Sequence, residues 1–336
     1  ERTAGHVRDD CGVNISIGSI CNMRSDALKK EGLATNITEL MQHGGHHLLG
    51  HSEEGDILVF GLNVNVHYLS VTPAIQCDGT FDCVVLPFTQ LYIFHAAVDN
   101  GVSFPILFCL VRGKNETVYV RLLRLVERLA GERRTVFNRP VQVVSDFEEA
   151  FIRAVGQYTA GQSLMCCFFH FTANMRKQAT PVMTKVKRAA RENVAMVRLA
   201  EKTKRAVMML PLLPAEMIGP DITDAIFARW AAAFPEHAGV FADFQDYVVR
   251  NYVRTTARFP PRIWSVSGRR IRTNNAAESS HSRLNASIRV SGAVTLDMFL
   301  AAVELEMRNT SRELATGCKS HSKTIYRTRD QLLATE

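Results

Sequence analysis

Hydrophobic and polar positions change their spacing along this chain. Between residues 57 and 113, short apolar runs rich in Val, Ile and Phe alternate with polar positions, which is typical of strands. The predicted strands are 57–71, 72–82, 84–99 and 102–113, with a turn at 99–101 between the last two. Apolar positions then recur at helical spacing over 115–134, and Asn115 is suited to cap that helix.

The pattern then alternates between the two kinds of element. Residues 141–146 are a predicted strand, 147–158 a short helix and 163–170 another strand. This order predicts an α/β domain with a mixed five-stranded sheet. Three antiparallel strands form a meander, a helix crosses over, and the fourth strand lies parallel beside the first.

Strand signals nearly vanish after residue 171. Segments 186–210, 222–234 and 240–253 each have a helical pattern, and prolines separate them. We therefore divide the chain into a helical or loop region (1–55), the first part of the core (56–175), a helical insertion (176–265), C-terminal core helices (266–316) and a polar tail (317–336). The chain begins with neither Met nor a signal-peptide pattern, so we expect a fragment.

Basic charge is concentrated in two places. The net charge is +7, yet residues 176–206 alone carry ten basic and two acidic groups, or +8. Residues 262–289 carry six basic groups and one acid, or +5, which leaves −6 for the remainder. This asymmetry indicates a polyanionic partner such as nucleic acid. A solvated helix face is the alternative.

Cysteine usage indicates a reducing compartment. The eight cysteines are scattered, form no CxxC motif, and several lie in apolar runs, as buried free thiols do. This favours cytosol or nucleus. The apolar runs are too short to span a membrane. A histidine group at 43–51 could bind a metal, but an exposed Gly-rich loop is the favoured interpretation.

Two acids follow or end predicted strands. In the expected strand order, Asp78 and Asp146 lie on adjacent central strands. Carboxylates that close repel each other unless a cation bridges them, and hard oxygen ligands suit Mg²⁺ or Mn²⁺. Each acid also has a purely structural interpretation, because Asp78 precedes Gly79 as in a turn and Asp146 could cap a helix.

A third acid is expected on a later helix. Glu278 is the one acid in the basic segment 262–289, and His281 lies three residues on, on the same helical face. The spacing from Asn275 to Glu278 also fits a capping box, which would make Glu278 structural.

The blocks CDGTF, QLYIFHAAVDN, VVSDFEEA, CCFFHF and RTNNAAESSHSRL occur in this order. Together they resemble the Mutator-like (MULE) transposase domain, over roughly residues 70–312. The resemblance implies an RNase H-like fold, with a large helical insertion before the last catalytic helix. It also implies that Asp78, Asp146 and Glu278 are the DDE metal ligands.

The resemblance also carries over a Cys-x2-His element, here Cys167 and His170. Zinc is disfavoured there because a second ligand pair at conventional spacing is missing. We expect His170 near the active site or the DNA backbone and Cys167 in the core. Trp264 could stack on a flipped base, although core packing is favoured.

The resulting hypothesis is a DNA transposase that hydrolyses phosphodiester bonds and joins strands, using two Mg²⁺ or Mn²⁺ ions. Asp78 would bridge both ions, Asp146 and Glu278 would hold one each, and His281 and His170 would assist. The partners would be double-stranded DNA, in the nucleus, and further copies of the chain on that DNA. The alternatives are a domesticated, non-cleaving DNA-binding regulator and another RNase H-like nuclease. The residues expected to contact DNA are Lys185, Lys187, Arg188, Arg191, Arg269, Arg270, Arg272 and Arg283.

Overall fold

A seven-stranded mixed sheet forms the centre of the computed structural model, which describes residues 6–8, 14–16, 47–82, 84–98, 102–133, 142–159, 164–273, 275–288 and 294–316. The order across the sheet is β3-β4-β7-β6-β5-β8-β9. The strands are β3 (Leu48–His51), β4 (Ile57–Gly61), β5 (Ala74–Thr80), β6 (Gln90–Val98), β7 (Val102–Val111), β8 (Gln142–Ser145) and β9 (Leu164–Cys166). Separately, β1 (His6–Arg8) pairs with β2 (Asn14–Ser16).

The predicted connectivity of the sheet is confirmed. Strands β5, β6 and β7 form an antiparallel meander, and β8 lies parallel to β5 on its free edge. Strand β9 extends the sheet parallel to β8. The sheet has two more strands than the five predicted, because β4, which is the first half of the predicted strand 57–71, and β3 lie beyond β7 as antiparallel strands.

The predicted strand at 57–71 is wrong in its second half. Strand β4 ends at Gly61, and two short helices follow, α3 (Asn63–Val66) and α4 (Tyr68–Val71). Val66 and Leu69, three residues apart, are buried, whereas Val64 and Val71 are exposed. Alternate apolar residues in this stretch therefore do not share one buried face, which is why a period of two misled.

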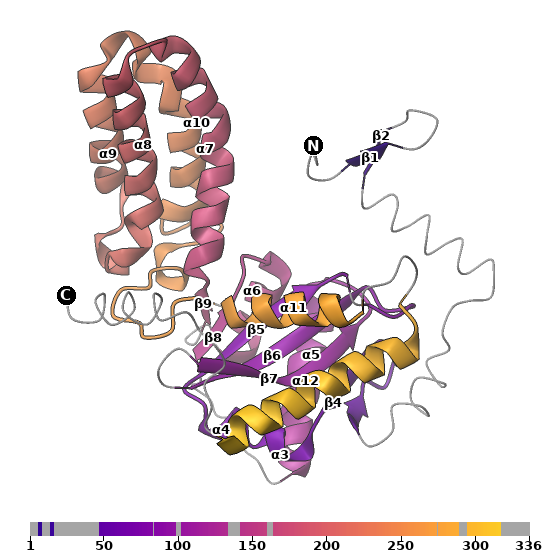
Figure 1. Ribbon diagram of the computed structural model, residues 1–336. Coiled ribbons are helices and arrows are strands. Elements are labelled where there is room, and N and C mark those ends of the chain that lie inside the picture. Colours follow the sequence, from indigo (N-terminus) through magenta and orange to yellow (C-terminus); the bar gives the residue numbers. More distant parts are fainter. Residues whose placement is uncertain are drawn as a thin grey trace.

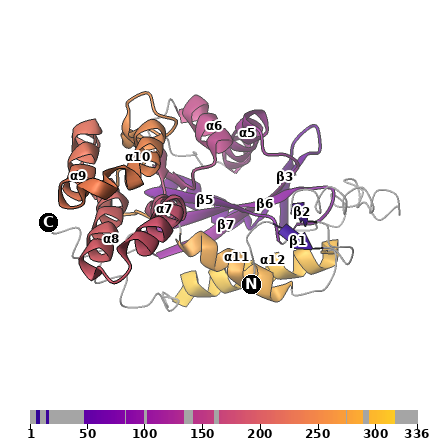
Figure 2. The same cartoon turned by 90° about the horizontal axis from the view of Figure 1, so that it is seen from above.

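Helices cover both faces of the sheet (Figure 2). Helices α5 (Glu116–Glu132) and α6 (Glu149–Thr159) lie on one face, and α11 (Asn275–Ser287) and α12 (Leu296–Thr316) lie on the other. The side chains of β5 alternate between the two faces of the sheet. Ile75 and Cys77 join the core beneath α5 and α6, whereas Asp78 faces His281 of α11.

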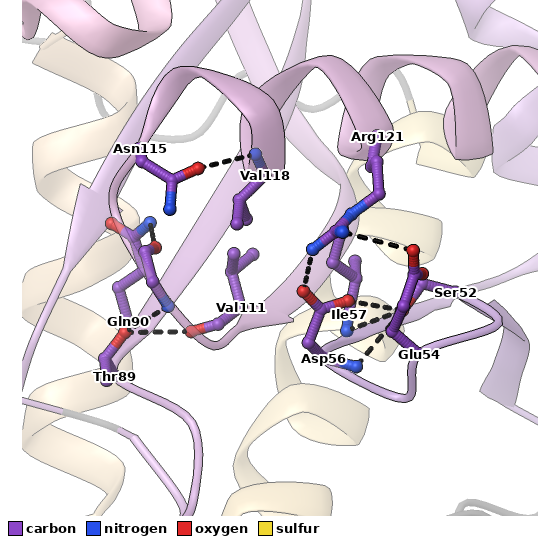
Figure 3. Close-up of polar contacts among 11 residues, drawn as sticks. Ser52, Glu54, Asp56, Ile57, Thr89, Gln90, Val111, Asn115, Val118 and Arg121 are labelled. Atoms are coloured by element: carbon purple, nitrogen blue, oxygen red, sulfur yellow. Dashed lines mark hydrogen bonds and ion pairs between the residues drawn. The ribbon is translucent and has the colours of Figure 1, made fainter.

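Polar contacts fix α5 at the end of the sheet (Figure 3). Asn115 caps the helix as predicted, its side chain accepting a hydrogen bond from the amide of Val118 at 3.0 Å. Further along α5, Arg121 forms ion pairs with Asp56 and Glu54 in the loop between β3 and β4. Polar contacts thus hold each of the first two turns of α5 in place.

The helical segment after β9 forms a bundle that stands away from the sheet (Figure 1). Its helices are α7 (Phe168–Ala190), α8 (Val194–Met209), α9 (Pro220–Ala233) and α10 (Ala242–Val248). Helix α7 is continuous across the boundary expected near residue 176. Among the described residues, no helix combines the length and the apolar character needed to cross a bilayer.

The predicted single helix at 186–210 is in fact two. Helix α7 ends at Ala190, Arg191 has a φ of 49°, and α8 begins after Asn193. The Asn193 side chain accepts a hydrogen bond from the amide of Met196 at 3.0 Å, as an N-cap does. A capping residue inside an apolar helical pattern therefore marks a turn between antiparallel helices.

The two tryptophans are core residues. Trp264 is 0% exposed and stacks on Phe171 of α7 with ring centroids 4.7 Å apart. Its indole nitrogen donates hydrogen bonds to the carbonyls of Phe259 and Tyr252. Trp230 of α9 is also fully buried. The alternative in which Trp264 stacks on a DNA base is therefore wrong, because the ring has no accessible face.

Because Trp264 packs where the bundle meets the sheet, Trp264→Ala should lower the free energy of unfolding by about 3–5 kcal/mol. Urea denaturation followed by circular dichroism measures this. The exposed Leu305 provides a control, since Leu305→Ala should change stability by less than about 0.5 kcal/mol. A Trp264→Ala protein as stable as the wild type would contradict the core assignment.

Candidate active site

The parallel pairing of β5 with β8 brings the two predicted aspartates together. The register pairs Gln76 with Val144. Continued for two more residues, this offset would set Asp78 opposite Asp146, although β8 ends at Ser145 and Asp146 lies just beyond it. Ile75 and Val143 face the core beneath α5 and α6, so alternation directs Asp78 to the opposite face, where His281 of α11 lies.

Asp78 is almost buried, with 8% of its surface exposed. One carboxylate oxygen accepts a hydrogen bond from the Gly79 amide at 3.0 Å. The other lies 3.6 Å from Nδ1 of His281 on α11. Burial lowers the pKa of His281 to about 4, so this imidazole is neutral near pH 7 and does not offset the charge of the carboxylate. The Nε2 atom of His281 is buried and has no hydrogen-bond partner among the described residues.

Asp146 lies just beyond β8 and before α6. One of its oxygens accepts a hydrogen bond from the amide of Glu148 at 2.9 Å. This local turn partly bears out the interpretation of Asp146 as a helix-start residue, although α6 itself begins at Glu149. The contact is compatible with a second role for the carboxylate.

Sequence reasoning missed a third carboxylate at this edge, Glu148. Burial raises its pKa, and so does the charge of Asp146, while a hydrogen bond with Tyr119 and the charge of Lys114 act in the opposite direction. Tyr119 in turn accepts a hydrogen bond from Gln90 at 2.9 Å. The signal in the sequence is the second acid of Asp146-Phe147-Glu148, at the start of the helix predicted over 147–158.

Glu278 occupies a position on α11, but its side chain lies outside the described residues. Its helix is placed by neighbouring groups. His281, one turn on, faces Asp78, and Ser280 is hydrogen-bonded to His95 of β6 at 2.9 Å. Among the described side chains no three His, Cys, Asp and Glu residues gather as a metal site. The convergence of Glu278 with the two aspartates therefore stays a prediction.

A short segment ahead of α11 ties the end of the insertion to the sheet. The amide of Phe168 donates to the carbonyl of Arg272 at 3.0 Å. Gln76 on β5 donates to the carbonyl of Thr273 at 2.8 Å, and Gln142 on β8 donates to that of Ile271 at 3.4 Å. The chain thus re-enters beside the two strands that carry the aspartates.

The Cys-x2-His element lies at the same edge of the sheet. Ser145 pairs with Cys166, so Cys167 follows the β9 strand next to Asp146. Cys167 is buried, as expected, and His170 lies half-buried on the first turn of α7. The positions of His170 near the active site and against DNA both stay predictions.

Seven of the eight predicted DNA contacts fall into two groups. Arg269, Arg270 and Arg272 precede α11, beside the start of α7. Four others lie near the turn between α7 and α8 and are exposed: Lys185, Lys187, Arg188 and Arg191. That turn lies at the far end of the bundle from the sheet (Figure 1), and the 23 residues of α7 span roughly 35 Å.

Arg283 has an internal partner. Its guanidinium is ion-paired with Glu306 of α12, whose side chain is only 5% exposed, and it donates to Ser280 at 2.9 Å. Its charge offsets that of a buried carboxylate and joins α11 to α12. A contact of Arg283 with DNA stays a prediction that would have to compete with this pair.

The buried histidine behind α11 should make stability depend on pH. Burial lowers the pKa of His95 to about 3, with the nearby His281 and Arg283 adding to the effect. Below the unfolded-state pKa of about 6.5, His95 binds a proton in the unfolded chain but stays neutral in the folded chain, so the free energy of unfolding falls as pH falls. One such group contributes a slope of up to about 1.4 kcal/mol per pH unit to the free energy of unfolding.

In His95→Asn, this contribution to the slope between pH 6 and pH 4.5 should vanish, as urea denaturation at several pH values would show. A variant that is merely less stable, with an unchanged slope, would contradict the assignment.

Comparison with known proteins now gives the domain its family. A search of curated proteins found no match to this chain. Residues 74–174 match the model of the MULE transposase domain, a segment that contains Asp78, Asp146, Cys167 and His170 but ends well before Glu278. The resemblance seen in the sequence motifs is confirmed for this segment: residues 74–174 form a MULE transposase domain.

Proposed function

We propose that this chain is the catalytic part of a DDE-type transposase that cuts and joins DNA strands. The observation that supports it most is the parallel pairing of β5 with β8 inside the matched domain, since its offset, continued past the end of β8, would set Asp78 beside Asp146. The order β7-β6-β5-β8-β9 is that of an antiparallel meander followed by two parallel strands, which supports assigning an RNase H-like fold. Glu278, on the helix that meets Asp78 through His281, would complete the triad.

The chemistry of the donors fits divalent cations. Asp78 and Asp146 offer carboxylate oxygens on adjacent strands, and the nearest imidazole, that of His281, is neutral. Two like charges at this separation favour a bound cation, and all-oxygen ligands suit Mg²⁺ or Mn²⁺. When bound, such ions supply an activated water or 3′-hydroxyl and stabilise the leaving oxygen.

The protein's own groups would position the DNA strand. His281, whose Nδ1 atom faces Asp78, would orient that carboxylate or a group bound beside it. Arg269, Arg270 and Arg272 would neutralise phosphates close to the acids. The basic turn between α7 and α8 would meet the duplex roughly 30 Å away, about one helical turn of B-DNA. We further propose that the enzyme works in the nucleus and assembles as a homo-oligomer on double-stranded DNA.

If the two aspartates hold the catalytic ions, Asp78→Asn and Asp146→Asn should each reduce Mg²⁺-dependent nicking of supercoiled plasmid to background, because an amide is a weaker, neutral ligand. Asp243→Asn on α10 is the matched control, an exposed carboxylate outside the site, and it should nick like the wild type. DNA binding should persist in all three. Wild-type protein that binds DNA but never nicks it, with Mg²⁺ or Mn²⁺, would favour the non-cleaving regulator instead.

If the bundle tip contacts phosphates, Lys187→Ala/Arg188→Ala should weaken binding to duplexes of any sequence. Each lost contact should also reduce the slope of log affinity against log salt by about 0.9. Arg229→Ala, an exposed cation on α9, is the control and should leave both quantities unchanged. Fluorescence anisotropy between 50 and 200 mM salt gives the slopes. Equal slopes for the double variant and the wild type would remove the tip from the DNA interface.

A further inference from the structure

Two phenyl rings stand exposed at the edge of the sheet where the acids lie. Phe169, on the first turn of α7, is 41% exposed, and Phe81, directly after β5, is 53% exposed. The chain otherwise buries its large aromatics well, and twelve of them are almost fully inaccessible. Exposed aromatic rings beside a candidate active site therefore call for a binding role.

The topology places these two residues after strands on either side of β8. Phe81 follows Asp78 by three residues at the end of β5. Phe169 follows β9, which lies beyond β8 and Asp146. Strands β5 and β9 are two strand spacings apart, about 10 Å. The two rings and the two acids thus belong to the carboxyl ends of three neighbouring parallel strands, at one edge of the sheet.

Cationic groups accompany both rings. The ammonium of Lys114 lies 3.7 Å from the centre of the Phe81 ring. On the other side, the amide of Phe168 bonds to the carbonyl of Arg272, so the Arg269–Arg272 loop runs beside Phe169. His170 packs against the Phe169 ring, with centroids 5.9 Å apart.

We infer that this edge binds unpaired nucleotides, with the Phe169 and Phe81 rings stacking on bases that flank the scissile phosphate. Positive charge that follows the backbone, together with aromatic rings that stack on bases, is the combination by which proteins hold single strands. Bases inside an intact duplex are stacked on their neighbours, so the rings can engage only where pairing is opened. This inference rests on the proposed DNA-processing function and adds the form of DNA that the site prefers.

The structure also gives the reason why the rings tolerate exposure. On α7, Phe171 and Thr172, the residues that soon follow Phe169, are buried and hold the start of the helix against the core. The Phe169 side chain is not needed for this packing. Substitution of an exposed side chain of this kind changes stability by less than about 0.5 kcal/mol. The variants can therefore be tested as folded proteins.

The test compares two fluorescein-labelled duplexes of the same arbitrary sequence, one fully paired and one with a central bubble of three mismatched pairs. Binding is measured by anisotropy with a chelator present, so that neither probe is cut. The wild type should bind the bubble more tightly. Phe169→Ala should weaken bubble binding roughly 5- to 150-fold, the range expected for one lost base stack, and leave the paired duplex unaffected. Phe81→Ala should act in the same direction.

Two further variants make the outcome decisive. Phe169→Trp should keep the preference for the bubble, because indole also stacks, and Leu305→Ala on α12 should behave as the wild type. Phe169→Ala that weakens both probes equally, or neither, would overturn the inference. Since no probe is cut, this result is independent of the plasmid-nicking test: nicking can fail while the bubble preference stands, and the reverse.

Discussion

The parallel ladder between β5 and β8 is the constraint on which the site depends. Every pair in it has the same sequence offset, as in Ile75 with Val143 and Gln76 with Val144. Ile75 and Val143 must face the core beneath α5 and α6. A slip of one residue would turn these side chains to the wrong face, so burial of apolar groups fixes the register. Continued past the end of β8, the same offset would set Asp78 beside Asp146, so that the core would also specify the spacing of the acids.

The helical insertion is joined to this arrangement at its two ends, and Arg258 also pairs with Glu149 of α6. Helix α7 leaves directly from β9, and residues 271–273 return beside β5 and β8 through three hydrogen bonds. At the junction, Trp264 stacks on Phe171, so the bundle shares its core with the sheet. The bundle can therefore present its basic tip far from the acids while the start of α11 stays fixed close to them.

Local pattern was sufficient for much of this. The period-two runs and the Asn115 cap predicted β5 to β9 and α5, and the strand order that follows put Asp78 beside Asp146. The local pattern failed where contacts with residues distant in the sequence decide the structure. The period-two alternation in 63–71 predicted a strand because the chain does not reveal which valines are exposed. The Arg283–Glu306 pair joins residues 23 positions apart on different helices, and the burial of Trp264 depends on α7. Glu148 was missed because its partner, Tyr119, comes from another element.

Different kinds of contact hold the different parts of the candidate site in place. The two aspartates lie on or next to central strands, where the ladder and the core on both faces hold the backbone. The position of the third acid is instead set by polar contacts of α11: Ser280 with His95, and Arg283 with the buried Glu306. A buried ion pair costs desolvation energy on formation, but removal of one partner costs about 3–5 kcal/mol. Such a pair is therefore better suited to fixing where a helix lies than to adding net stability, and here it fixes α11, the helix that carries Glu278.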